Sequence, residues 1–128
     1  MICIATKRLH QHIASGKLHL TLGNVMKLPY PDNSMDRIFH VNCYYFWDDL
    51  DQGCKELYRV LSPGGAMITT MNYKLLKLSI EKNLNAYAHN YDPDAYMKSL
   101  EKTGFTGVRM EHLKDGDKDF QAIFACKE

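Results

Sequence analysis

The sequence has no large excess of charge of either sign and no long apolar run. Sixteen lysines and arginines stand against fifteen acidic residues, for a formal net charge of +1. Such a balance provides no strong field that would attract nucleic acid or an anionic membrane. No stretch approaches the roughly 18 apolar residues that suggest a membrane span. We therefore expect neither a nucleic-acid partner nor a membrane partner.

The chain also lacks the residue spacings of a metal site or a disulfide framework. No C-x-x-C pair occurs, and the four cysteines lie at wide, irregular intervals, at Cys3, Cys43, Cys54 and Cys126. His10 and His12 are two positions apart on an expected helix and so lie on different faces. The N-terminal segment turns basic after five residues, unlike a secretory signal. These features predict no bound metal, free thiols and a cytoplasmic location.

Alternating helical and strand periodicities predict an α/β fold in a single domain that spans residues 1–128. Expected helices occupy residues 2–15, 50–61, 74–90 and 93–103. Expected strands occupy residues 18–22, 37–42, 66–71, 108–113 and 120–126. Strands that alternate with helices favour a mostly parallel sheet, and the tight turn KDGDKD predicts that the last two strands form an antiparallel hairpin.

Asparagine recurs where expected strands end. Asn24, Asn42 and Asn72 each follow a strand, and an open α/β sheet binds its ligands beyond the carboxyl ends of its strands. An asparagine side chain both donates and accepts hydrogen bonds, so it can read an adenine edge or a carboxylate. Asparagine also tolerates turn geometry, so a purely structural role at these ends stays open.

The run from Gly23 to Gly65 resembles the UbiE-like class I methyltransferases. GNVMKLPYPDNSMDRIFHVN (23–42) is similar to a family pattern of glycine, Asp or Asn, a small residue, Leu-Pro-Phe/Tyr, a polar turn and a hydrophobic strand. YFWDDL and RVLSPGG continue the pattern in order, with Ser62 in place of a lysine. The resemblance implies a Rossmann-like methyltransferase sheet, S-adenosylmethionine (SAM) as cofactor and a small molecule as methyl acceptor.

This resemblance also implies which residues bind the cofactor. Asn24 matches the position whose side chain meets the adenine amino group, and the backbone N–H of Val25 is similarly placed to meet a ring nitrogen. Val41 and Asn42 match positions that approach the ribose and methionine parts. Tyr45 lies in the segment that faces both cofactor and substrate.

Aromatic side chains are the candidate substrate contacts. We expect Tyr44, Trp47 and Tyr73 on the substrate side. Trp47 shares with Tyr45 the segment that faces both cofactor and substrate, where a ring face can attract the cofactor's sulfonium. Packing in the core is an alternative for each ring of the cluster. Methyl transfer to a good nucleophile depends on placement and desolvation, so no catalytic residue is designated. His40 and Tyr44 could move a proton, but the place of His40 within a strand favours a structural role, as we also expect for Arg59.

The family's glycine-rich cofactor loop is absent, because the sequence contains no G-x-G. The first helix resembles the one that follows the family's second, acidic strand. We therefore interpret the chain as a partial methyltransferase domain without its first βαβ unit, whose missing strand self-association or a partner could supply. Three hypotheses follow: an enzyme of this family, a non-catalytic truncated isoform or fragment that binds cofactor weakly, and an unrelated α/β nucleotide-binding or interaction module.

Overall fold

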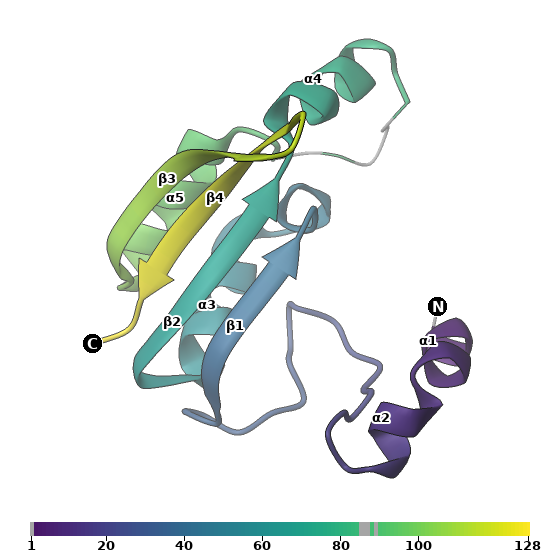
Figure 1. Cartoon of the computed structure of the whole chain (residues 1–128). Coiled ribbons are helices and arrows are strands. Elements are labelled where there is room, and N and C mark those ends of the chain that lie inside the picture. Colours follow the sequence, from purple (N-terminus) through teal and green to yellow (C-terminus); the bar gives the residue numbers. More distant parts are fainter. Residues whose placement is uncertain (1, 85–87, 89) are drawn as a thin grey trace.

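The computed structural model describes residues 2–84, 88 and 90–128 and folds them around a four-stranded sheet (Figure 1). Its elements follow in chain order: α1 (Ile2–Arg8), α2 (His10–Ala14), β1 (Met35–Val41), the 3-10 helix η1 (Tyr44–Phe46), α3 (Leu50–Val60), β2 (Leu61–Met71), α4 (Tyr73–Glu81), α5 (Pro93–Thr103), β3 (Thr106–Asp115) and β4 (Lys118–Cys126).

The sheet combines one parallel pair with an antiparallel hairpin. Its strand order is β1-β2-β4-β3. Strands β1 and β2 are parallel, with His40 opposite Thr69, and helix α3 is the crossover between them. Strand β4 runs antiparallel to both β2 and β3. The expected α/β class and the C-terminal hairpin are confirmed.

Local sequence signals account for the helices that position the core. Asp49 precedes α3 and accepts a hydrogen bond from the Gln52 N–H, as an N-cap residue does. Asp92 caps α5 in the same way, and Pro93 takes the first helical position. Gly104 follows α5 with a φ of 126°, a conformation that L side chains rarely adopt. Helices α3 and α5 cover one face of the sheet and enclose the core (Figure 1).

Three of the expected elements differ from the structure: one is wrong and two are wrong in part. Residues 18–22 form no strand, and Leu22 has 84% of its surface exposed. The first helix breaks at Leu9 into α1 and α2. Helix α4 ends at Glu81. Two residues later, Asn83 has a left-handed φ of 56° in the turn that follows. Residues 85–87 and 89, the remainder of the expected helix 74–90, lie outside the described residues.

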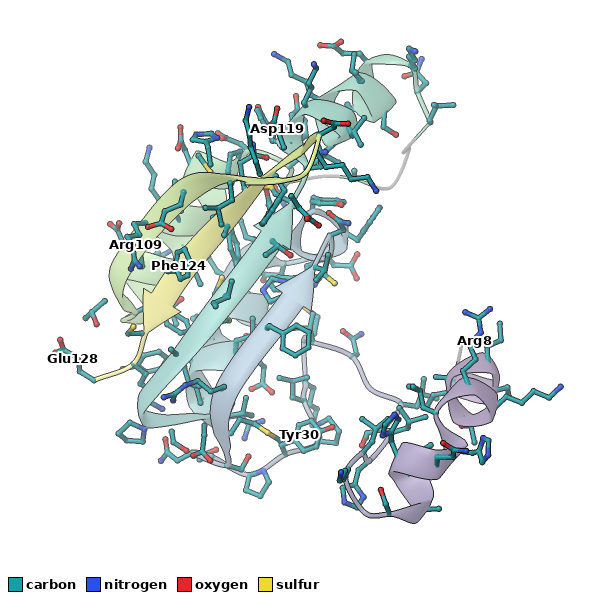
Figure 2. The ribbon with its side chains drawn as sticks, in the orientation of Figure 1. Arg8, Tyr30, Arg109, Asp119, Phe124 and Glu128 are labelled. Atoms are coloured by element: carbon teal, nitrogen blue, oxygen red, sulfur yellow. The ribbon has the colours of Figure 1, made fainter. Side chains whose placement is uncertain are left out.

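The second face of the sheet carries no helix within the part of the chain that the structure describes (Figure 1). Phe39 is 81% exposed, Val41 51% and Ile68 38%. On the same face, the Arg109 guanidinium lies 4.4 Å from the centre of the Phe124 ring (Figure 2). Sheets with parallel strands are normally covered on both faces, so this uncovered face is the unusual feature of the fold.

Candidate functional site

The parallel pairing of β1 and β2 brings Asn42 and Asn72 to one edge of the sheet. The Asn42 N–H donates to the Thr70 carbonyl oxygen at 3.0 Å. Two hollows of about 240 Å³ each open at this edge, and both asparagines line both of them. The other lining residues are Val41, Thr70, Met71 and Phe120 in one hollow and Tyr45, Leu75, Leu76 and Ser79 in the other.

The two asparagines differ in how their side chains are used. Asn72 caps α4: its Oδ1 accepts from the Leu75 N–H at 3.0 Å and its Nδ2 donates to the Asp119 carbonyl oxygen at 2.9 Å. Asn42 adopts a left-handed φ of 54°, which asparagine tolerates better than most residues. Its exposed carboxamide makes no hydrogen bond to any described residue. Asn42 therefore has donors and an acceptor available for a ligand.

Asn24 and Val25 lie in the loop between α2 and β1. The Asn24 Oδ1 accepts from the Met26 N–H at 3.0 Å, and the Asn24 carbonyl oxygen accepts from the Lys27 N–H at 3.0 Å. Val25 is half-buried against the core. Because residues 18–22 are not a strand, Asn24 does not stand at a strand end as expected. Asn24 does not line either of the two hollows at Asn42.

The four aromatic candidates occupy different places. Tyr45 is 5% exposed and lines the hollow beside Asn42. Tyr44 is fully buried, and its hydroxyl donates to the Tyr91 carbonyl oxygen at 2.9 Å. Trp47 is buried with its ring centroid 5.3 Å from that of His40. Tyr73 begins α4, where its N–H donates to Gln121. These positions favour core packing for Tyr44 and Trp47.

His40 belongs to a buried polar cluster under α5. Its Nε2 lies 3.0 Å from both the Tyr96 hydroxyl and the Thr69 Oγ1, which are 2.8 Å apart. The buried Nδ1 has no partner among the described residues. Burial lowers the pKa of His40 to about 4, so the ring is neutral near pH 7. This environment supports the expected structural role and leaves His40 away from the strand-end hollows.

Other hollows of the described residues lie away from Asn42, and one of about 340 Å³ is lined by Lys74 and by residues of the β3–β4 hairpin. A hollow of about 830 Å³ is lined by side chains of α1 and by His10, the first residue of α2. Helix α1 has no buried residue, so this hollow is an exposed helix surface. No cluster of three or more His, Cys, Asp or Glu side chains suited to a metal occurs in the described ranges. Nor does any described helix have the length and apolar character to cross a membrane.

Sequence reasoning missed most of the lining from α4 and β4. Leu75 and Ser79 are four residues apart on α4, so they face the same way. That spacing was readable in the sequence. Phe120 enters only because β4 lies beside β2, a long-range pairing that no local signal indicates.

The chain is similar in sequence and in structure to methyltransferases. The sequence model of the family described as "Methyltransferase domain" matches residues 1–69. The ubiquinone/menaquinone biosynthesis C-methyltransferase UbiE of Vibrio cholerae is 27% identical, and the match covers 73% of this chain and 36% of that protein. This chain thus spans about a third of the length of such curated relatives.

Solved structures of methyltransferases have the same fold. A SAM-dependent methyltransferase from Thermotoga maritima superposes with a TM-score of 0.72 at 23% identity, over 95% of this chain and 70% of that one. Phosphoethanolamine N-methyltransferase 2 of Haemonchus contortus, in complex with phosphomonomethylethanolamine and S-adenosylhomocysteine, superposes with a TM-score of 0.74 at 16% identity. That match covers 99% of this chain and 41% of that one. The Rossmann-like methyltransferase sheet expected from the sequence is confirmed.

Proposed function

This chain belongs to the methyltransferase domain family, and from that premise we propose that it takes part in transferring a methyl group from SAM to a small molecule. SAM is the cofactor of the class I family to which its sequence and fold assign it. The observation that carries the proposal is Asn42, which follows the carboxyl end of β1. It lies within the matched residues, and its unbonded carboxamide lines a hollow. The parallel β1–β2 pair creates this edge of the sheet, as it does in other open α/β sheets that bind ligands.

We assign the cofactor contacts to five residues. Asn24 and the Val25 N–H meet the adenine, and Val41 and Asn42 meet the ribose and methionine parts. Tyr45 offers its ring face to the sulfonium, because the quadrupole of an aromatic ring attracts a cation. SAM supplies an activated methyl group on sulfur, so the protein's contribution is to place the acceptor in line and exclude water.

The methyl acceptor in this proposal is a small molecule that enters beside α4. Tyr73 begins that helix, and it is the one substrate-side candidate that the core does not bury. Relatives named for quinone and phosphoethanolamine methylation support an acceptor of small size.

A second candidate function is that of a non-catalytic chain that depends on a partner. The observation that favours it is the uncovered sheet face, where Phe39 is 81% exposed beside Val41 and Ile68. A partner or a second copy that covered this face and paired with the free edge of β1 would remove apolar surface from water. In that case the chain alone would bind SAM weakly or not at all.

Calorimetric titration of the 128-residue chain with SAM tests the first candidate. We expect micromolar binding, and we expect Asn42→Gly to weaken it roughly five- to tenfold, the effect of losing about one hydrogen bond. Glycine preserves the left-handed backbone at this position. Asn83→Gly is the matched control, because Asn83 has a φ of 56° in the turn after α4.

Two outcomes would contradict parts of this proposal. Absence of binding by the wild-type chain at millimolar SAM would contradict cofactor binding and favour the partner-dependent candidate. Equal weakening by Asn42→Gly and Asn83→Gly would remove Asn42 from the site.

A further inference from the structure

Helix α3 presents three polar side chains to the loop that carries Asn24 and Val25. Gln52, Glu56 and Arg59 are spaced four and three residues apart, so they share one side of the helix. The Gln52 Nε2 donates to the Met26 carbonyl oxygen at 3.0 Å. Glu56 Oε2 accepts from the Leu28 N–H at 2.7 Å. The loop is therefore bonded to the helix through its backbone.

Arg59 extends these contacts along the loop. Its Nη2 donates to the Leu28 carbonyl oxygen at 3.0 Å and its Nη1 to the Tyr30 carbonyl oxygen at 2.7 Å. Asp32 forms an ion pair with the same guanidinium at 2.8 Å. The Arg59 Nε donates to the Glu56 Oε1 at 2.8 Å, which orients the guanidinium. This hydrogen bond lowers the pKa of Glu56. The planar fork of arginine suits several acceptors at once.

Met26 connects these contacts of α3 to Asn24, the residue assigned to the adenine. Its carbonyl oxygen accepts from Gln52, while its N–H donates to the Asn24 Oδ1 at 3.0 Å. The Gln52 hydrogen bond thus holds the residue that orients the Asn24 carboxamide. A carbonyl oxygen has two lone pairs, so Asn24 Oδ1 keeps one for an adenine amino group.

We propose that Gln52 is a positioning residue that sets the selectivity for adenine by holding Met26 and, through it, Asn24, while Glu56 and Arg59 hold the next turn of the loop. This inference rests on the proposed function. Gln52 is not part of the hydrophobic core. Helix α3 contributes Cys54 and Leu57 to that core. Loss of the Gln52 bond therefore acts first on the loop, whose Val25 and Met26 pack against the core from outside it.

The test compares two ligands that differ along the edge of the purine that Asn24 and Val25 are proposed to contact. Calorimetry gives the dissociation constants of S-adenosylhomocysteine and S-inosylhomocysteine, in which an oxygen replaces the amino group and the neighbouring N1 carries a hydrogen. We expect the wild-type chain to prefer the adenosine compound, and Gln52→Met to reduce that preference roughly fivefold, as for one misplaced hydrogen bond. Lys55→Met is the matched control on the exposed side of α3 and should leave the preference unchanged.

A merely structural Gln52 would give a different result. Equal weakening of both ligands by Gln52→Met, or an unchanged preference, would overturn the positioning role while the wild-type chain still bound S-adenosylhomocysteine. Failure of the wild-type chain to bind that compound would instead contradict the proposed function, and this inference with it. If Gln52→Met does not fold, Gln52→Glu removes the donor with the same shape and suits the first turn of a helix.

Discussion

Replacing Tyr96 by alanine is expected to lower the free energy of unfolding by ~3–5 kcal/mol, the range for removing a buried aromatic ring. Tyr96 is fully buried, and its ring stacks on that of Tyr44 with centroids 4.4 Å apart. Its hydroxyl also bonds Thr69 at 2.8 Å. The change would leave a cavity between α5 and the sheet, and His40 and Thr69 would each lose their hydrogen bond to the Tyr96 hydroxyl. Urea denaturation followed by circular dichroism measures the loss.

Two other variants serve as controls, one for the hydroxyl of Tyr96 and one for a tyrosine ring outside the core. Tyr96→Phe keeps the ring and should cost only ~1–3 kcal/mol, the penalty for unpaired buried polar groups. Tyr73→Ala removes a half-buried ring at the start of α4 and should cost less than Tyr96→Ala. If Tyr96→Ala cost no more than Tyr73→Ala, the buried stack would not be the centre of the core.

Acidification is expected to destabilise the fold through His40. The pKa of His40 falls from 6.5 to about 4 on burial. Because the folded pKa is the lower one, this contribution is fully present above pH 6.5 and is lost as the pH falls toward 4. The loss should reach ~2 kcal/mol by pH 5 and ~3 kcal/mol by pH 4. Urea denaturation at a series of pH values gives the slope.

Histidine variants assign that slope to one side chain. In His40→Gln, the free energy of unfolding should vary little between pH 6.5 and pH 5. His19→Gln changes an exposed histidine and should keep the wild-type slope. Asp51 and Glu56 have lowered pKa values and lose their contributions at lower pH, so the upper part of the range isolates His40. Parallel slopes for wild type and His40→Gln would contradict the assignment.

Elements whose signals are local were predictable from the sequence. The Asp92-Pro93 start and the Gly104 end define α5 within the residues that carry them. The hairpin turn at Gly116 is equally local, with a φ of 61°. The resemblance of residues 23–65 to methyltransferases is also written in consecutive residues, and the match to residues 1–69 confirms that family.

Features that depend on distant partners were not predictable. The alternation of Leu18, Leu20 and Leu22 suits a strand, yet a strand needs a neighbour to bond, and those residues pair with none that the structure describes. The contact of Gln52 with Met26 links positions 26 residues apart. A glutamine or a methionine in the sequence does not predict this hydrogen bond, because both residue types are common on exposed surfaces.

The uncovered face of the sheet has a thermodynamic consequence. Heat capacity rises on unfolding mainly because apolar surface becomes hydrated. Phe39, Val41 and Ile68 already meet water in the folded chain, so they contribute little to that rise. For the chain alone, the free energy of unfolding should therefore vary less with temperature than its length suggests. A companion that covered this face would restore this temperature dependence as well as the stability.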